Sequence, residues 1–351
     1  MLETIIIVLS VITILGTFIK LLKKDAWWIR FFDFPQAQLA VLGMLCLIGV
    51  IVEFSFNEWW HFVLTLILTG ATVYESIIVF PYTWLANKES KRITGVDDAY
   101  TLSLMISNVY MYNREYQRLV KVVKDTSPDV LILVETDMKW EHGVKEIEQY
   151  YPYTIKYPID NTYGILMYSK LELRCSEVKF MVEEDIPSIH TYVKLRSGDL
   201  LKLYAIHPEP PSPTENERST ERDAELYLVA REVEQVEGPV IVAGDLNDVA
   251  WSHSTRIFQR LSRLLDPRKG RGFFNTFNAK IPILRWPLDH VFHSRHFRLL
   301  DIQRLPAIGS DHFPMYIKLA YSPDNLNDEP LEEPAEDEER EEAVEKIRAA
   351  L

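Results

Sequence analysis

The chain has 351 residues, which is long enough for two or three domains with ample hydrophobic cores. Its two cysteines, Cys46 and Cys175, lie far apart and support neither a disulfide framework nor a metal site. A formal charge of −13 would weigh against a polyanionic partner if it were spread over the whole chain, but it is not. Residues 322–351 hold twelve acidic and three basic side chains, so the other 321 residues carry a net charge of only −4.

The acidic segment 322–351 also contains three prolines and few apolar residues. Such a composition cannot bury enough apolar surface to offset the entropy of ordering, so it predicts a disordered acidic tail. A short helix over residues 339–350 is the alternative for its last part. Because the charge is concentrated in this tail, a phosphorylated ligand is not excluded for the rest of the protein.

Three apolar runs, at residues 4–19, 37–52 and 62–80, occupy the first 85 residues. The first two reach the length of a membrane-spanning helix once their flanking apolar residues are counted. Tryptophan and tyrosine residues lie at the ends of the runs, as in the aromatic belts of membrane proteins. We therefore expect a three-span transmembrane region over residues 1–85, with the lipid bilayer as a partner. A buried helical hairpin in a soluble protein is the alternative.

The orientation of these spans follows from their charged flanks. No positive residue precedes the first run and no small-residue cleavage site follows it, so it does not resemble a signal peptide. Four positive residues come directly after it: Lys20, Lys23, Lys24 and Arg30. By the positive-inside rule the first loop is cytoplasmic, and three spans then place the C-terminal domain in the cytoplasm. The sequence thus predicts a multi-pass protein, in a bacterial inner membrane, with a cytoplasmic catalytic domain.

After a linker at residues 86–99, residues 100–321 alternate between strand and helix patterns. Expected strands cover residues 102–109, 130–135, 165–168, 191–195, 200–207, 240–243, 288–292 and 315–320. Expected helices cover residues 114–124, 139–149, 221–237 and 255–265. This mixture of hairpins and helical crossovers predicts an α+β fold in which helices cover the sheets.

Polar residues stand at the ends of the expected strands, where a chain leaves the hydrophobic core. They are Asn108, Glu135, His207, Asp245, Asn247, Asp289, Asp311 and His312. An ionised carboxylate is too costly to bury within a strand, so such residues emerge at strand ends. Carboxylates and amides suit a hard cation that also binds a phosphate, which indicates a Mg²⁺ or Mn²⁺ site. Ordinary turn chemistry is the alternative for each residue taken singly.

The order of these motifs resembles the endonuclease/exonuclease/phosphatase superfamily. The resemblance extends over about residues 102–320 and includes Gly-Asp-Leu-Asn at 244–247 and Ser-Asp-His-Phe-Pro at 310–314. The superfamily includes deoxyribonuclease I-like nucleases, apurinic endonucleases, neutral sphingomyelinases and inositol polyphosphate 5-phosphatases. The resemblance implies a four-layer α/β/β/α sandwich, with two packed mixed sheets flanked by helices and the active site at their upper edge.

The resemblance also implies a role for each residue on the metal side. Glu135 is the principal metal ligand, with Asp311 as a further acid and Asn108 beside the metal. Asp245 is the base that orients or deprotonates the attacking water. From the residues alone, Asn108 could equally be a cap at the end of its strand.

On the phosphate side, Asn247 holds the phosphate and His312 stabilises the charge that develops on it. Asp289 orients His312, and His207 faces the phosphate. A hydrogen-bonded core histidine remains the alternative for His207. Together these roles describe phosphoryl hydrolysis by in-line attack of water.

One departure from the apurinic endonucleases lowers the expectation of a DNA-repair enzyme. Those proteins carry an acid two residues after the first Asn, whereas Tyr110 stands at this position. Asn113 is a candidate to replace some of its function.

The substrate is less well defined by the sequence. Basic and aromatic residues alternate over residues 256–277, between the two main motifs: Arg256, Arg260, Arg263, Arg268, Lys269, Arg271, Phe273, Phe274 and Phe277. They would suit nucleic acid or a lipid phosphate, or form a solvated helix face with core phenylalanines. A membrane-anchored phosphoesterase with a lipid-linked or small phosphorylated substrate is the favoured hypothesis. The alternatives are a nuclease acting on DNA or RNA and a non-catalytic membrane scaffold.

Overall fold

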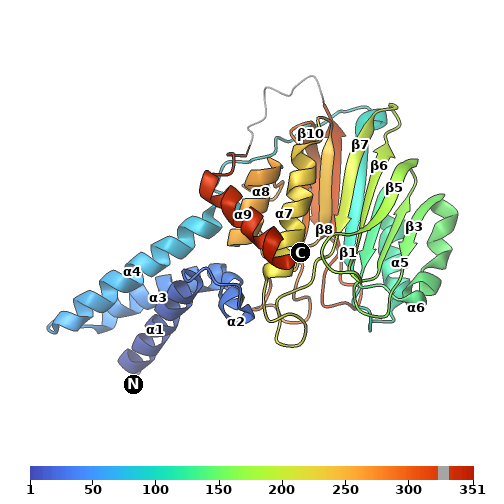
Figure 1. The fold of residues 1–351 in the computed structure, drawn as a ribbon. Coiled ribbons are helices and arrows are strands. Elements are labelled where there is room, and N and C mark those ends of the chain that lie inside the picture. The colour runs from blue at the N-terminus through green and yellow to red at the C-terminus, as the bar shows by residue number, and fades with distance from the viewer. Residues whose placement is uncertain (323–331) are drawn as a thin grey trace.

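The computed structural model describes residues 1–322 and 332–351. A helical extension projects from one side of a larger sandwich of sheets and helices (Figure 1). The extension contains α1 (Leu2–Lys20), α3 (Gln36–Glu53) and α4 (Trp59–Val79), joined by the short helix α2 (Trp27–Arg30). Three helices in this part of the protein are long and apolar enough to cross a membrane.

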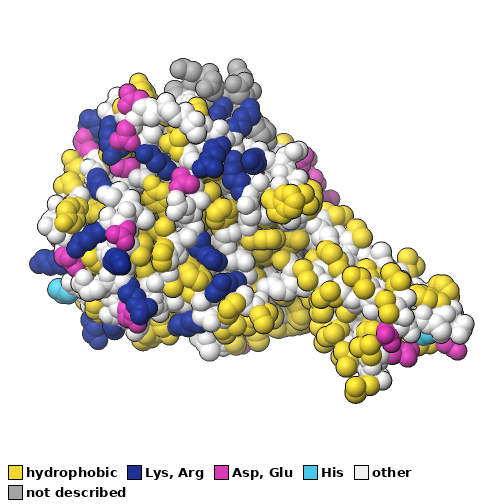
Figure 2. Space-filling model, turned by 180° about the vertical axis from the view of Figure 1, so that it is seen from behind, with side chains coloured by type: hydrophobic (Ala, Val, Ile, Leu, Met, Phe, Trp, Pro, Cys, Tyr) yellow, Lys and Arg dark blue, Asp and Glu magenta, His cyan; other side chains and the backbone are white. Residues whose placement is uncertain are grey.

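Hydrophobic side chains cover most of the helical extension on the face drawn in Figure 2. Large apolar residues such as Leu66 and Ile77 are exposed on its outer surface. The polar residues are turned inward, where Lys20 and Glu75 form an ion pair and Thr17 donates to Glu75 over 2.7 Å. An apolar outer surface around inward-facing polar groups such as the Lys20–Glu75 pair is the arrangement expected of helices packed in lipid.

Two mixed sheets form the centre of the larger part. The strands are β1 (Thr101–Asn108), β2 (Val130–Val134), β3 (Tyr153–Tyr157), β4 (Ile165–Ser169), β5 (Leu173–Phe180), β6 (Pro187–Lys194), β7 (Leu200–Ile206), β8 (Val240–Asp245), β9 (Asp289–His293), β10 (Phe297–Arg304) and β11 (Met315–Tyr321). The first sheet has the order β10-β11-β1-β2-β4-β3, and the second has the order β5-β6-β7-β8-β9. In each sheet the central strands include one parallel pair, β1 with β2 and β7 with β8.

Helices cover the outer face of each sheet, which produces four layers (Figure 1). One outer layer consists of α5 (Tyr116–Thr126) and α6 (Met138–Gly143), and the other of α7 (Thr220–Glu234), α8 (His253–Ser262) and α9 (Asp337–Ala350). The main hydrophobic core lies between the two sheets, and a further core lies under each helical layer. The predicted α+β, four-layer α/β/β/α sandwich is therefore confirmed.

Three strands, β3, β5 and β10, were not predicted from the sequence. All three are edge strands, and β3 and β5 have mostly exposed or half-exposed side chains. An edge strand that faces solvent lacks the continuous apolar run of a central strand. The helix expected over residues 139–149 is also divided, because a 3₁₀ segment (Lys145–Tyr150) follows α6.

The acidic tail requires a correction. Residues 337–350 form the helix α9, which packs on α7 through the buried residues Ala343 and Ile347. A capping box between Glu336 and Glu339 begins this helix. Apolar residues four positions apart and basic partners on the sandwich, such as Arg260, overcome the charge that favoured disorder. The remainder of the predicted tail, residues 323–331, lies outside the described residues.

The helical extension shares a hydrophobic cluster with the sandwich. Trp251 and Ala250, which follow β8 closely, pack against Tyr82 and Ala40 of the extension. The Tyr82 hydroxyl donates to the Ala250 carbonyl over 2.7 Å, and Trp251 Nε1 donates to the Asp33 carbonyl over 2.9 Å. The connection at residues 86–99 runs along the sandwich, with a backbone hydrogen bond from Ile93 to Leu299. The extension thus contacts the loop that follows Asp245.

Candidate active site

Polar residues from both sheets meet at one edge of the sandwich. The parallel strands β1 and β2 end beside each other, which brings Asn108 next to the residue that precedes Glu135. In the second sheet β8 ends at Asp245, which pairs with Asp289 at the start of β9. Since both pairs of strand ends lie at the same edge, four residues that are far apart in the chain come together.

Asn108 links the two sheets. Its side-chain amide donates to Glu135 Oε1 over 2.7 Å and to Asp245 Oδ2 over 2.9 Å. Its own Oδ1 accepts from the backbone N–H of Tyr110 over 2.9 Å. The buried amide is therefore committed to orienting two carboxylates, so it is more than the strand-end cap considered from the sequence.

His312 lies between two carboxylates. Its Nδ1 is 2.8 Å from Asp289 Oδ2 and 3.6 Å from Asp245 Oδ2. Burial lowers the affinity of this ring for a proton, but Asp289 and Asp245 outweigh that effect and raise the pKa of His312 to about 10. Asp289 thus holds the His312 ring as an imidazolium, and the catalytic role predicted for this pair remains a prediction.

Burial changes the protonation of the carboxylates at the same edge. It raises the pKa of Glu135 to about 7, against the hydrogen bond from Asn108 that favours the ionised form. It also raises the pKa of Asp245, and the nearby His312 offsets part of this increase. A cluster of acids with raised pKa values at one edge is characteristic of a functional site and of one suited to a cation.

Unusual backbone conformations accompany these residues. Glu135 has a φ of 57° and Asn247 a φ of 50°, values that are uncommon for residues with side chains. Gly244 lets β8 approach β7 closely, because a Cβ at this position would lie 1.9 Å from the carbonyl oxygen of Ile206. Gly164 likewise allows a close approach of the backbone beside Glu135, because a Cβ at this position would lie 1.8 Å from the carbonyl oxygen of Thr136. Such strain gathers where side chains must be held in position.

Asn247 and His207 lie on the phosphate side of the predicted site. The Asn247 backbone N–H donates to Asp245 Oδ1 over 3.0 Å, and its side-chain amide donates to the Pro208 carbonyl over 3.0 Å. His207 is buried against the Tyr163 ring, at 5.5 Å between ring centroids. Its Nδ1 has no hydrogen-bond partner among the described residues, and burial lowers its pKa to about 4. His207 is therefore a neutral imidazole with one buried ring nitrogen that no described residue hydrogen-bonds.

Asp311 is less firmly held than the other acids. Its carbonyl accepts from the Ala279 N–H over 2.6 Å, and its carboxylate is 3.4 Å from the hydroxyl of Ser310. Its charge acts on both Glu135 and His312, so it belongs to the same electrostatic cluster. The metal-ligand role predicted for it remains a prediction.

The donor set fits a hard divalent cation. Asp245, Asp289 and His312 offer ligand atoms that all lie within 4.8 Å of one another. His312, however, is already paired with Asp289 through the nitrogen nearest both acids. Glu135 forms no ion pair with a cation among the described residues, and burial is the main cause of its raised pKa. The role of Glu135 as the principal metal ligand remains a prediction.

Sequence reasoning missed several contacts that support the site, although Phe277 was among the aromatic residues considered for substrate binding. Phe277 lies against His312 with ring centroids 5.0 Å apart, and Ser310 Oγ donates to the Asn108 carbonyl over 2.9 Å. The buried Arg222 donates to the Asn247 carbonyl over 3.0 Å and pairs with Asp248 at 3.2 Å. A serine directly before Asp-His was a usable signal, but nothing local in the sequence connects Arg222 to a strand end eighteen or more residues away.

The basic and aromatic stretch at residues 256–277 is mostly structural. Arg268 is fully buried with Asp266 at 2.7 Å, Lys269 pairs with Glu89 at 2.8 Å, and Arg260 pairs with Glu339 at 2.7 Å. These cations neutralise acids of the protein and are not free for substrate. Asn113 likewise does not replace the missing acid, since its amide donates to the carbonyls of Val109 and Ile308.

Other cations lie next to aromatic residues that follow the motifs. Lys280 lies 4.9 Å from the ring centroid of Tyr110. Arg285 and Arg304 lie 5.0 and 4.4 Å from the ring centroid of Phe313, the residue after His312. These side chains add positive charge near the two motifs, which suits an anionic ligand.

Two packed sheets with paired acids, an acid-held imidazolium and a neutral histidine at one edge define a hydrolase of phosphoester bonds. The model of the Endonuclease/Exonuclease/phosphatase family matches residues 105–312, so the chain belongs to this family. No curated protein matches the sequence.

Solved structures support the same fold. A humanized D. rerio TDP2 is 18% identical, with a TM-score of 0.51, over 63% of this chain and 99% of that one. D. rerio TDP2 complexed with single-strand DNA product is 19% identical, with a TM-score of 0.51, over 62% and 98%. A family protein from Bacteroides thetaiotaomicron is 16% identical, with a TM-score of 0.52, over 63% and 98%. At these identities the likeness establishes the fold of the sandwich.

Proposed function

We propose that the protein is a membrane-anchored, divalent-metal-dependent phosphoesterase that hydrolyses a lipid-linked or small phosphorylated substrate by in-line attack of water. The observation that carries the reaction is the linked set of Glu135, Asn108, Asp245, His312 and Asp289 at one edge of the sandwich. A bound Mg²⁺ or Mn²⁺ would supply charge neutralisation at the phosphate.

The protein's own residues divide the remaining work. Asp245, held by Asn108 and by the Asn247 N–H, is placed to orient water and accept its proton. His312, kept protonated by Asp289, would donate to a phosphate oxygen as negative charge develops on it. His207 offers a neutral ring nitrogen on the same side. This division of roles requires no covalent intermediate.

A lipid-linked substrate is supported by the loop at residues 278–285, which we name the apolar loop. Ile281, Ile283 and Leu284 on this loop are 46%, 79% and 44% exposed. The loop is joined to the site, because Ala279 donates to the Asp311 carbonyl, and it also reaches the helical extension, where Gln38 donates to the Ile283 carbonyl over 3.1 Å. Exposed apolar side chains flanked by cations are typical of a segment that enters a lipid interface.

The reaction is tested on the purified full chain in detergent, with Mg²⁺ or Mn²⁺ and with chelator. We expect metal-dependent release of phosphate from a lipid phosphomonoester or cleavage of a phosphodiester lipid. Asp245→Asn should lower the rate about 10³-fold or more, whereas Asp125→Asn, an exposed acid on α5, should leave it unchanged. Equal rates for the wild type and Asp245→Asn on every substrate would falsify the enzymatic proposal.

The substrate class is tested by competition between phosphate esters. Plasmid DNA and RNA oligonucleotides are offered beside the lipid phosphate and a soluble nitrophenyl phosphoester. Ile283→Glu should lower the rate on lipid in vesicles and spare the rate on the soluble ester, because it removes only contact with the interface. Faster cleavage of nucleic acid than of any lipid or small ester would favour the nuclease alternative and reject the proposed substrate class.

A further inference from the structure

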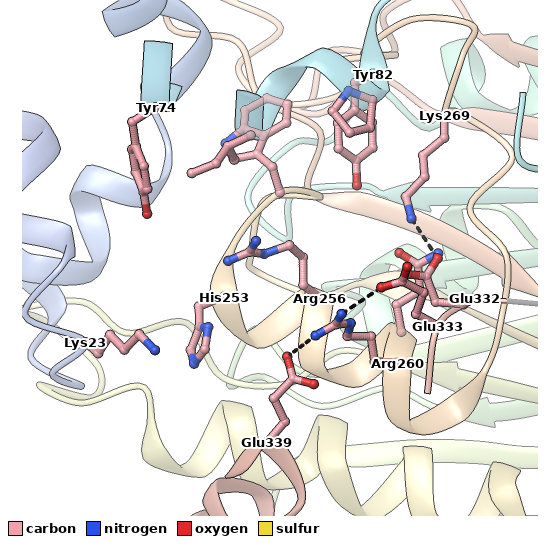
Figure 3. Close-up of a pocket in the computed structure, with 14 residues that line it drawn as sticks. Lys23, Tyr74, Tyr82, His253, Arg256, Arg260, Lys269, Glu332, Glu333 and Glu339 are labelled. Carbon is pink, nitrogen blue, oxygen red and sulfur yellow. Dashed lines mark hydrogen bonds and ion pairs between the residues drawn. The ribbon is translucent and has the colours of Figure 1, made fainter. Parts of the chain in front are cut away.

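A cavity of about 500 Å³ lies where the helical extension meets the sandwich (Figure 3). Its walls come from Lys23 in the segment after α1, from the last turns of α4 and from α8. None of the residues of the candidate active site lines it. The cavity therefore requires its own explanation.

The charges around this cavity are divided between its two ends. At one end the acids are matched, since Arg260 pairs with Glu333 and Glu339, and Lys269 pairs with Glu332 (Figure 3). At the other end Lys23 and Arg256 line the cavity near Tyr74 and His253. Among residues 1–322 and 332–351, neither cation forms a salt bridge, whereas His253 binds Glu342 at 2.9 Å. Asp33 and Glu75 act on Tyr74 from nearby, so Lys23 and Arg256 lack a direct acidic partner in a region that also contains acids.

The side of α4 next to the cavity is apolar. Val73, Ile77 and Phe80 are exposed and line a shallow apolar groove between α3 and α4. The residues that directly follow them in the chain, Tyr74, Ile78 and Pro81, line the charged cavity. Because successive helical residues are about 100° apart, the groove and the cavity lie on adjoining faces of the same helix.

We propose that this cavity is a binding site for the phosphate headgroup of an anionic lipid, separate from the catalytic site. The phosphate would lie between Arg256 and Lys23, and the acyl chains would follow the apolar groove along α4. Arginine and lysine in a pocket at the end of membrane helices are the groups that recognise anionic headgroups. The inference rests on the proposed membrane anchoring but not on the proposed catalytic activity.

A consequence follows for the catalytic domain. Trp251 lines the cavity and belongs to the loop that follows Asp245 and Asn247. The same residue donates to the Asp33 carbonyl of the extension. A lipid bound in the cavity would thus hold the extension and the catalytic loop together.

The test is a lipid titration of the full chain in detergent, followed by native mass spectrometry. An Asp245→Asn background with chelator prevents turnover. Phosphatidylglycerol, phosphatidylcholine and soluble glycerol 3-phosphate are the three probes. We expect phosphatidylglycerol to bind at least fivefold more tightly than either of the other two.

The cavity is tested by two matched double variants. Lys23→Gln with Arg256→Gln should weaken phosphatidylglycerol binding at least fivefold. Lys24→Gln with Lys121→Gln removes the same charge at exposed positions that do not line the cavity, and should leave the affinity unchanged. Equal affinities of the two double variants for phosphatidylglycerol would overturn the inference. So would binding of glycerol 3-phosphate by the original chain as tight as its binding of phosphatidylglycerol.

The two proposals fail in distinguishable ways. Loss of the cavity cations should leave hydrolysis of a soluble phosphoester by the otherwise wild-type chain unchanged, because neither residue lies in the candidate active site. A chain that binds phosphatidylglycerol through Lys23 and Arg256 but hydrolyses no ester would refute the proposed function alone.

Discussion

At the scale of single residues, the site depends on a few buried polar groups that restrain one another. Asn108 holds two acids from different sheets, and Asp289 holds His312. Each interaction is between a charged group and a partner in a poorly solvated environment, where such bonds are worth most. Conservative substitutions at these positions should therefore change the reaction more than the fold.

Asp289→Asn tests the orientation of His312. The amide keeps the shape but removes the charge that keeps the ring protonated, so the pKa of His312 should decrease and a donor to the phosphate is lost. We expect kcat to decrease by about 10²–10⁴-fold with little change in KM. Steady-state kinetics from pH 5 to pH 10 is the measurement, with Asp125→Asn as the control. An unchanged kcat would contradict the assigned role.

Glu135 provides a pH-dependent prediction in the absence of metal. Its pKa is raised by burial to about 7 in the folded protein, above the value of an exposed glutamate. A carboxyl with a raised pKa is protonated and harmless at low pH, and stability is lost as pH rises through about 7 because the buried group must ionise. Glu135→Gln should therefore raise the thermal midpoint at pH 8 and change it little at pH 5.

The measurement is thermal unfolding of the full chain in chelator at the two pH values. Adding Mg²⁺ should stabilise the wild type more than Glu135→Gln at pH 8. A stabilisation by the substitution that is equal at both pH values would show that the ionisation of Glu135 is not the cause.

At the scale of secondary-structure elements, the sequence predicted what periodic apolar runs can reveal. The central strands β1, β2, β7, β8 and β11 were expected because both faces are buried. The edge strands β3, β5 and β10 were not, because many of their side chains are exposed or half-exposed, whereas the edge strand β9 was expected because it is buried. For the segment that forms α9, disorder was the main expectation and a short helix the alternative, because its apolar residues are few and its acids are matched by basic residues distant in sequence.

The same limit applies to the candidate site. Asp245, Asn247 and His312 could be predicted because they stand in short motifs at strand ends, where the physical reason for their position is local. Phe277 and Arg222 could not, because their contacts with His312 and Asn247 arise from packing between distant elements.

Gly244→Ala tests the close approach of β7 and β8. A Cβ would lie 1.9 Å from the Ile206 carbonyl oxygen, so the strands must separate and Asp245 must move with them. We expect a loss of about 3 kcal/mol or more in unfolding free energy and of most activity. Gly238→Ala, where a Cβ would meet nothing within 4 Å, is the control. Equal unfolding curves for the two variants would contradict the prediction.

Ile347→Asp tests the docking of α9. Ile347 is buried against α7, and an unpaired carboxylate at this position must either be buried or release the helix. We expect a loss of about 3 kcal/mol or more, together with increased exchange of α9 amide hydrogens. Ala349→Asp places the same side chain at an exposed position of α9 and should cost about 1 kcal/mol or less. Protection of α9 that is unchanged in Ile347→Asp would refute the docking.

At the scale of the whole molecule, the helical extension and the sandwich act as one unit because they share a hydrophobic cluster around Trp251. Exposed apolar side chains cover the part of the extension that projects from the sandwich (Figure 2). If the extension lies in a bilayer, the apolar loop and the cavity beside α8 both lie at its margin, since each contacts the extension. The catalytic edge would then work beside the membrane surface.

The predicted orientation is tested with reporters fused after residue 351 in a bacterial host. The positive residues that follow α1 predict, by the positive-inside rule, that the sandwich lies in the cytoplasm. A fluorescent protein at this position should therefore be bright, and an exported alkaline phosphatase should be inactive. Active alkaline phosphatase at this position would reverse the predicted topology.

Asp223 brings together three segments that are made at very different times. It is fully buried, and its carboxylate binds Arg222, Arg30 of the extension at 3.4 Å and Lys346 of α9 at 2.8 Å. Burial alone would raise the pKa of Asp223, but these cations lower it, so the group is ionised only when they are in place. During synthesis Arg30 is made long before Lys346, so it cannot meet both partners until the end of the chain has been made. The helical extension, α7 and α9 are therefore joined at Asp223 only late in folding.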